Sequence, residues 1–308
     1  DDHVDEEIRK CFSPENPKCF FVFAGAGSGK TRSLINTLTY IEEKMGKQLS
    51  ETSRKVAVIT YTNAAVDEIS RRMHYSSFIA VSTIHSFLWD LIKNFQSDIR
   101  EWVSKDLKVK IKDIEDKLSK SRTAKSTEKK EEEIKHKQER LVKLSTVKSF
   151  LYNPNGDNSG YNSLNHDEVI KMGCEFIENE ITMQKILVSQ YPIVLVDESQ
   201  DTKKELVDAL NAVINNNKGE FIVGMFGDTM QRIYLDGKEN LSDSISDEWV
   251  KPVKVMNHRS AVRIVQLANS IRSSVDGQQQ KPRSDAMDGV VRLFIVDSSA
   301  DKDATEKK

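Results

Sequence analysis

The chain has few cysteines, no long apolar run and almost no net charge, and each shortage excludes a class of protein. Its three cysteines, Cys11, Cys19 and Cys174, form no C-x-x-C pair. This odd set predicts a reducing compartment, the cytoplasm, and excludes a disulfide framework or a cysteine zinc site. No apolar run approaches the roughly 18 residues of a membrane span, so no membrane partner is expected.

Two further absences concern targeting and charge. The N-terminal run DDHVDEEIRK is acidic and polar, which is not typical of a signal peptide. The formal net charge is −2, so the chain is not a globally basic nucleic-acid binder. Any nucleic-acid surface must therefore come from a local excess of positive charge.

Short apolar runs alternate with helical patterns along much of the chain. Five runs are typical of buried parallel strands: 19–23, 55–61, 79–84, 192–197 and 221–228. This alternation predicts an α/β fold, a parallel sheet with helices on both faces. Ligands of such sheets bind at the carboxyl ends of the strands.

The alternation stops between about residues 88 and 187. Residues 105–143 carry 14 Lys/Arg and 9 Asp/Glu, a local net charge of +5. Within them, apolar residues repeat at helical spacing at Leu107, Ile111, Ile114 and Leu118. The polar run 119–130 resembles an exposed tip. We predict a charged antiparallel helical hairpin, ended by the turn-rich loop 153–160. A solvated hairpin without a ligand and a nucleic-acid-binding hairpin both remain open.

The region after residue 250 has weaker patterns. Residues 253–273 predict a strand and a helix, and 289–297 predict another strand. The polar residues 298–308 are expected to be disordered.

A glycine-rich turn between a predicted strand and a predicted helix is the most informative feature. Glycine lets the backbone turn tightly and approach an anion closely. The N–H groups of the turn and of the helix N-terminus then cradle a triphosphate. Lys30 is expected to reach the β- and γ-phosphates, and Thr31 to bind Mg²⁺. The expected cradle is Ala24, Gly25, Ala26, Gly27, Ser28, Gly29, Lys30, Thr31 and Arg32, with Ala24 where the strict pattern has glycine.

A second element, DESQDT, follows the predicted strand 192–197. Asp197 is expected to hold Mg²⁺ through water, and Glu198 to polarise the attacking water. The alternative is an acidic cluster that caps the following helix. Alone this signal is weak, but together with the phosphate loop it indicates a nucleotide hydrolase.

Two further runs supply candidate contacts to the nucleotide. Gln231 is a candidate to sense the γ-phosphate or orient the water, and Tyr234 to stack on adenine. Arg259 is a candidate arginine finger for the γ-phosphate. The alternatives are a surface glutamine, a core tyrosine and a surface arginine.

Motif by motif, the chain resembles the UvrD/Rep type of superfamily 1 helicases. The resembling runs are AGAGSGKT (24–31), VITYTNAAVDEISRRM (58–73), VSTIHSF (81–87), DESQDT (197–202), GDTMQRIY (227–234) and NHRS (257–260). That family's phosphate loop commonly begins with alanine, which accounts for Ala24. The resemblance implies a RecA-like P-loop NTPase that uses ATP and Mg²⁺ to move on single-stranded DNA, usually 3′ to 5′.

The resemblance also implies a domain organisation. Residues 1–88 and 188–256 correspond to the first motor domain, and 89–187 to its all-helical insertion, which includes the charged hairpin. Residues 257–308 correspond to the start of a second motor domain, whose remainder is expected to be missing. The chain alone is therefore expected to bind ATP–Mg²⁺, to hydrolyse it slowly and not to unwind DNA.

DNA contacts implied by the resemblance map onto two strand ends. Thr62 and Asn63 follow the second predicted strand, and His85 follows the third. Hydroxyl, amide and imidazole donors at such positions can hold the phosphates of a strand that crosses the sheet edge. Tyr61 is expected in the core, and a structural role is the alternative for His85.

The chain departs from the family at two contact positions. The family has an adenine-contacting glutamine near the place of Arg9, and residues 1–23 contain no glutamine. Asp236 stands where the family often has a base-stacking tryptophan. A function from another class also stays open: a nucleotide-switched module that docks a protein partner through hairpin 105–143 without translocation.

Overall fold

The computed structural model describes residues 1–308 apart from 120–123, 155, 157, 229–244, 275–276 and 294–308. Six parallel strands form one sheet in the order β3-β2-β4-β5-β1-β6. They are β1 (Phe20–Ala24), β2 (Val56–Thr60), β3 (Ile79–Thr83), β4 (Ile193–Val196), β5 (Ile222–Gly227) and β6 (Val253–Lys254). The predicted α/β fold is confirmed, and the five predicted strands agree within one residue at each end.

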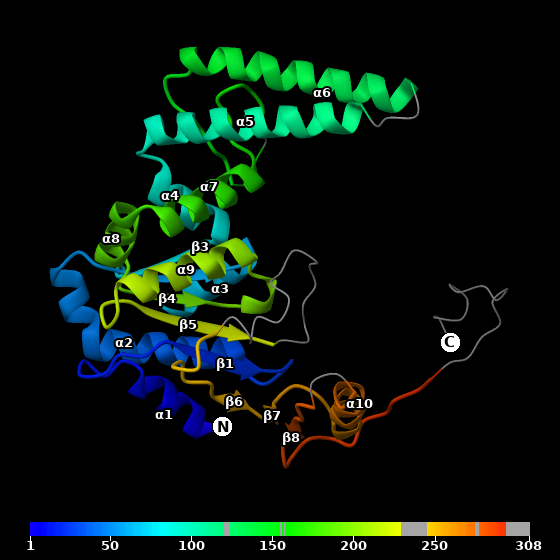
Figure 1. The fold of residues 1–308 in the computed structure, drawn as a ribbon. Coiled ribbons are helices and arrows are strands. Elements are labelled where there is room, and N and C mark those ends of the chain that lie inside the picture. Colours follow the sequence, from blue (N-terminus) through cyan, green and yellow to red (C-terminus); the bar gives the residue numbers. More distant parts are fainter. Residues whose placement is uncertain (120–123, 155, 157, 229–244, 275–276, 294–308) are drawn as a thin grey trace.

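Helices cover both faces of the sheet, as predicted (Figure 1). One face packs against α1 (Asp2–Lys10), α2 (Lys30–Glu51) and α3 (Asn63–Arg72). The other packs against α4 (Ile84–Ile92), α7 (His166–Asn179), α8 (Ile181–Gln190) and α9 (Lys204–Asn216). Successive strand residues enter opposite cores because side chains alternate along a strand, so Val58 and Ile59 lie in different clusters.

The predicted helical hairpin stands away from the sheet as α5 (Gln96–Leu118) and α6 (Ala124–Lys143), side by side (Figure 1). Short 3₁₀ segments, η1 (Leu144–Thr146) and η2 (Ser199–Asp201), follow α6 and β4. Burial along α5 falls from Leu107, which is buried, to Leu118, which is partly exposed. Helix α6 begins at Ala124, inside the run 119–130 that was predicted as an exposed tip. The Lys- and Glu-rich residues from Ala124 onward are good helix formers, which accounts for the difference.

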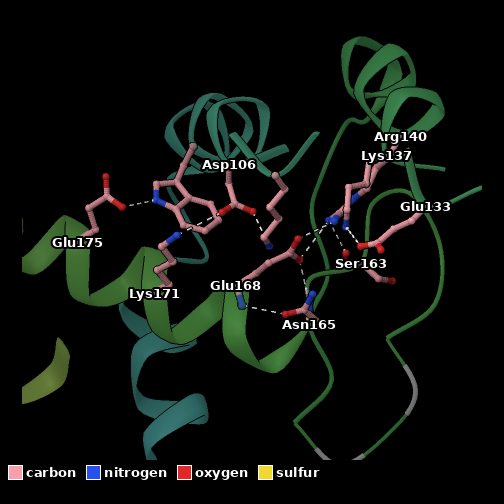
Figure 2. Close-up of polar contacts among 11 residues, drawn as sticks. Asp106, Glu133, Lys137, Arg140, Ser163, Asn165, Glu168, Lys171 and Glu175 are labelled. Atoms are coloured by element: carbon pink, nitrogen blue, oxygen red, sulfur yellow. Dashed lines mark hydrogen bonds and ion pairs between the residues drawn. The ribbon is translucent and has the colours of Figure 1, made fainter. Parts of the chain in front are cut away.

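Two buried carboxylates connect the hairpin to α7 (Figure 2). Glu168 accepts bonds from Arg140 of α6 at 2.7 and 3.3 Å, and it completes a capping box with Asn165. Asp106 of α5 pairs with Lys110 at 2.7 Å and with Lys171 of α7 at 3.5 Å. Each buried charge therefore has charged partners, which offset the cost of removing it from water.

The last described part of the chain contributes a second, smaller sheet (Figure 1). It contains α10 (Val262–Arg272) and two paired strands, β7 (Met256–Asn257) and β8 (Lys281–Pro282). The strand predicted at 289–297 is wrong for its described part, since residues 289–293 are not a strand. A strand needs a neighbour for its backbone hydrogen bonds, whereas Val290 and Leu293 are 65% and 85% exposed. Residues 294–308 lie outside the described part.

Two predicted absences bear on membranes and disulfides. Within the described residues, no helix has both the length and the apolar content needed to cross a bilayer. Cys11, Cys19 and Cys174 are free and buried. Burial raises the pKa of the Cys11 thiol to about 12 and that of Cys19 to about 11.

Replacing Glu168 with alanine is expected to loosen the hairpin from α7. The change leaves the Arg140 guanidinium without its carboxylate and removes half of the capping box, so the insertion should lose about 3 kcal/mol of stability. Hydrogen exchange of the α6 and α7 amides measures this loss. Glu133→Ala is the matched control, since Glu133 makes an exposed pair with Lys137 on α6, worth no more than about 0.5 kcal/mol. Equal exchange in the two variants would contradict the anchoring role of Glu168.

Candidate active site

The glycine-rich loop lies between β1 and α2, at the carboxyl ends of the strands. The Ser28 N–H donates to the Gly25 carbonyl at 3.1 Å and closes a tight turn. Gly27 and Gly29 have φ angles of 72° and 84°, in the left-handed region that other residues avoid. Gly29 is also the N-cap of α2, whose first N–H groups have no acceptor within the helix. This geometry fits the predicted anion cradle.

Lys30 and Glu198, predicted from separate motifs, form an ion pair. Lys30 Nζ donates to Glu198 Oε2 at 2.5 Å across 168 residues of sequence. Because β5 lies between β1 and β4 in the sheet, the pair spans the carboxyl end of β5. The Lys30 side chain is 9% exposed and that of Glu198 is 39% exposed. The amine is therefore enclosed, while the carboxylate still reaches solvent.

Asp197 occupies the end of β4 beside this pair. Its N–H donates to the Ile59 carbonyl at 2.8 Å, and its side chain accepts from the Glu198 N–H at 3.0 Å. Burial, together with the neighbouring Glu198 charge, raises the pKa of Asp197 to about 6. Glu198 has a φ of 49°, a left-handed value that is strained for a residue with a side chain. A cation at Asp197 would relieve the cost of this buried negative charge.

Three buried hydroxyls around the loop and the strand ends have no hydrogen-bond partner in the described part of the chain. They are the side-chain oxygens of Ser28, Thr60 and Ser199. Buried polar groups are almost always hydrogen-bonded in native proteins, so such a group of orphans indicates a missing ligand or water. All three belong to the edge where the predicted nucleotide would bind.

The predicted Mg²⁺ ligands fit a site shared with substrate. Thr31 is the second residue of α2 and is half-buried, and Asp197 is buried. The described residues contain no group of three or more His, Cys, Asp or Glu side chains arranged for a metal. Mg²⁺ commonly binds through one or two carboxylates, several waters and substrate phosphates. The donor set therefore suits a Mg²⁺ ion brought in by a triphosphate.

Arg259, the predicted γ-phosphate contact, has its Cβ against the phosphate loop. A Cβ added to Gly27 would meet the Arg259 Cβ at 2.8 Å. Two hydrogen bonds hold this segment on the loop: His258 N–H to the Gly27 carbonyl at 2.8 Å and Asn257 Nδ2 to the Ala26 carbonyl at 2.9 Å. Arg259, whose side chain is exposed, is thus held beside the loop although it lies more than 200 residues away in the sequence.

Sequence reasoning missed several polar residues of this site. Gln200, Asp228 and Asn257 lie inside the motifs quoted above, but no role was predicted for them. Gln280, which donates to the Ala26 carbonyl at 3.1 Å, and the buried Arg272 had no sequence signal. Membership in a motif could have pointed to the first three residues. A glutamine or arginine outside any motif is instead expected to be an exposed surface residue.

The predicted DNA contacts divide into two groups. Thr62 caps α3 by accepting from the Ala65 N–H at 3.2 Å, and Asn63 is the first residue of α3. Both are exposed at the carboxyl edge of the sheet. The prediction that Tyr61 lies in the core is wrong: β2 ends at Thr60, and Tyr61 is 41% exposed beyond it.

His85 is half-buried in α4 rather than open at the edge. Its ring meets the His166 ring edge-on at 4.9 Å, and His166 in turn contacts the Tyr152 hydroxyl at 2.6 Å. Burial, with the nearby His166 and Lys203, lowers the pKa of His85 to about 4. At neutral pH the ring is therefore uncharged.

The adenine side of the site is described only in part. Gln231, Tyr234 and Asp236 lie outside the described residues. Arg9, near the expected place of the missing glutamine, pairs with Glu6 at 2.6 Å and lies over the Tyr40 ring. These contacts turn it toward α2.

Known proteins with similar sequences include DNA helicases and a Gabija protein. Gabija protein GajB of Bacillus cereus (strain HuB5-5) is 25% identical and aligns with 92% of this chain and 51% of its own. ATP-dependent DNA helicase Rep of Escherichia coli (strain K12) is 25% identical, over 80% of this chain and 40% of its own. ATP-dependent DNA helicase PcrA of Staphylococcus epidermidis (strain ATCC 35984 / RP62A) is 23% identical, over 92% and 42%. The chain spans about half the length, or less, of these relatives.

The family comparison covers both halves of the site described above. The model of the UvrD/REP helicase N-terminal domain matches residues 5–235, which is more than half of the chain. That range contains the phosphate loop, the Lys30–Glu198 pair and the strand-end residues Thr62 and Asn63. From its sheet, its site and this match together, the chain belongs to the UvrD/REP helicase N-terminal domain family.

Proposed function

We propose that this chain is the ATP-binding part of a DNA-dependent ATPase and helicase of the UvrD/Rep type. The observation that carries the proposal is the Lys30–Glu198 ion pair at the carboxyl edge of the sheet, with Arg259 placed against the same loop. In this proposal residues 1–88 and 188–256 form the first motor domain, 89–187 its insertion, and 257–308 the start of the second motor domain. Opening and closing of the two domains steps the DNA, in the 3′ to 5′ direction.

The residues divide the work of phosphoryl transfer between them. Lys30 and the N–H groups of the loop bind the β- and γ-phosphates, which draws the amine away from Glu198. Glu198 then accepts a proton from the attacking water, and Arg259 offsets the charge that develops on the γ-phosphate. Thr31 and Asp197 are the proposed Mg²⁺ ligands, and the ion would neutralise phosphate charge. Gln231 and Tyr234 are proposed to contact the γ-phosphate and the adenine.

Single-stranded DNA is the proposed polymer ligand, crossing the sheet edge at Thr62 and Asn63. Both side chains are exposed there, beside the catalytic edge, so a DNA contact and a nucleotide contact would lie on neighbouring strand ends. His85 is proposed as a structural neighbour of this surface, since its ring is half-buried and neutral. The cytoplasm is the proposed compartment, on the ground that all three thiols are free and buried.

Glu198→Gln and Lys30→Ala are expected to separate hydrolysis from binding. Glu198→Gln removes the general base, so kcat for ATP should fall by about 10²- to 10³-fold with little change in nucleotide affinity. Lys30→Ala removes a charge-assisted phosphate contact, so nucleotide affinity should fall by about tenfold or more. Steady-state ATPase assays and titration with a fluorescent ATP analogue measure the two effects. Lys47→Ala, an exposed change on the same helix, is the control. Unchanged hydrolysis in Glu198→Gln would rule out its role.

DNA dependence is tested by the ATPase rate with and without single-stranded DNA. We expect stimulation in a version that carries a complete second motor domain, and slow, unstimulated hydrolysis by the present chain. Asn63→Ala in the longer version should weaken DNA affinity about fivefold, the cost of one hydrogen bond, while Asn94→Ala, at an exposed site after α4, should not. Absence of stimulation in both versions would favour a nucleotide-switched module that docks a protein through hairpin 105–143.

The pH dependence of stability is expected to report on His85. Its folded pKa of about 4 lies below its usual 6.5, so the unfolded chain takes up the proton first and stability is lost as the pH falls from about 6.5 toward 4. His85→Gln should therefore flatten the fall in melting temperature between pH 7.5 and pH 5. His136→Gln, at an exposed position on α6, should leave the slope as it is. An unchanged slope in His85→Gln would show that the ring takes up its proton equally readily in the folded and the unfolded chain.

A further inference from the structure

Arg272, the last residue of α10, is buried although most of its helix is not. The described helix buries only Val265 and Arg272, while Ile264, Leu267 and Ile271 are between 45% and 56% exposed. A guanidinium taken out of water is costly unless it is fully paired. An amphipathic helix that places arginine inside and isoleucine outside indicates a specific partner for the arginine.

That partner is Asp228, the residue that follows β5. Arg272 donates to both Asp228 oxygens, at 3.0 and 2.9 Å, and to Gln278 at 3.2 Å. The side chains are 9% and 1% exposed. A two-bond contact of this kind fixes the carboxylate in orientation as well as in position, which a lysine with its point charge would not do.

Asp228 in turn orients Gln200. The Asp228 N–H donates to Gln200 Oε1 at 3.1 Å, and Gln200 Nε2 donates to Glu198 Oε2 at 2.7 Å. The two ends of the amide are thus assigned by their partners, since a flipped amide would set oxygen against carboxylate. A continuous polar chain therefore runs from Arg272 to the carboxylate that also binds Lys30.

Close packing at Gly227 makes this chain stiff. A Cβ on Gly227 would lie 2.3 Å from Ser199 Oγ and 3.0 Å from Gln200 Oε1. Gly227, the last residue of β5, therefore packs directly against η2, with no room for a side chain between them. Asp228 cannot shift without moving Gln200, and through it Glu198.

We propose that Arg272 is a positioning residue for the Glu198 carboxylate, acting through Asp228 and Gln200. The inference rests on the proposed ATP hydrolysis. When a triphosphate draws Lys30 away, Gln200 is the side chain in the described structure that still holds Glu198, so its orientation sets where the general base points. Arg272 belongs to the segment after residue 257, so the base is correctly aimed only while that segment is seated on the loop.

The test compares kcat with nucleotide affinity in Arg272 variants of the full chain. Arg272→Gln should lower kcat for ATP by about tenfold or more, the usual effect of a misplaced catalytic group, with affinity for a fluorescent ATP analogue changed by less than about twofold. Arg272→Lys keeps the charge that Asp228 needs and loses the two-bond contact, so it should fold and lower kcat in the same direction. If Arg272→Gln unfolds, Arg272→Lys takes its place in the test. Arg263→Gln is the control, since Arg263 lies on the same helix and its side chain makes an exposed pair with Asp288, which is outside the helix.

A second arm separates positioning from general support of the fold. In the Glu198→Gln background the group to be positioned is gone, so Arg272→Gln should lower the residual rate no further. An equal loss in both backgrounds, or a joint loss of kcat, affinity and melting temperature in both Arg272 variants, would overturn the proposal. Unchanged ATP hydrolysis in both Arg272 variants would overturn the positioning role of Arg272 and leave the proposed function standing. Absence of ATP hydrolysis in the wild-type protein would overturn the proposed function and this role together.

Discussion

The Lys30–Glu198 contact is the constraint on which the rest of the site depends. It requires β1, β5 and β4 to end at one edge, because the two residues follow strands that β5 separates. Parallel strands satisfy this requirement since all of their carboxyl ends lie on the same side of the sheet. In the sheet β1 lies between β5 and β6, and the chain runs from β1 to β2, which lies beyond β5 and β4. Ligands of open α/β sheets bind at the carboxyl ends of the strands, where such connections diverge. The topology of the sheet therefore determines which residues meet in the site.

Nucleotide and metal together would give Lys30 and Asp197 each a partner of opposite charge. Lys30 is offset by Glu198, while burial and the neighbouring Glu198 charge raise the pKa of Asp197. A triphosphate alone would free Glu198 and add negative charge beside Asp197. A metal alone would satisfy Asp197 and leave Lys30 where it is. Under the proposed function, a Mg–triphosphate would offer an anion to Lys30 and a cation to Asp197 at the same time.

The parts predicted correctly from the sequence are those set by local physics. Apolar runs located five strands, and glycines located the turn before α2, because burial and left-handed φ angles restrict the choice of residue. The errors were non-local. Residues 289–293 have strand-like composition but pair with no strand in the part of the chain that the structure describes, and Tyr61 lies just past the end of β2. Arg272 and Gln280 could not be assigned, since the same residue types are usually exposed and only the folded chain reveals what they face.

The phosphate loop faces the proposed nucleotide on one side and the segment that contains Asn257 and Gln280 on the other. Its small residues allow a close approach on both sides. The peptide unit between Ala26 and Gly27 has its carbonyl held by Asn257 and Gln280. A trans peptide points its N–H away from its carbonyl, so fixing one side of the unit sets the direction of the other. A Cβ on Gly25 would meet Gln280 Nε2 at 2.5 Å, so the contact needs glycine there. The segment after residue 257 is therefore part of what gives the anion cradle its shape.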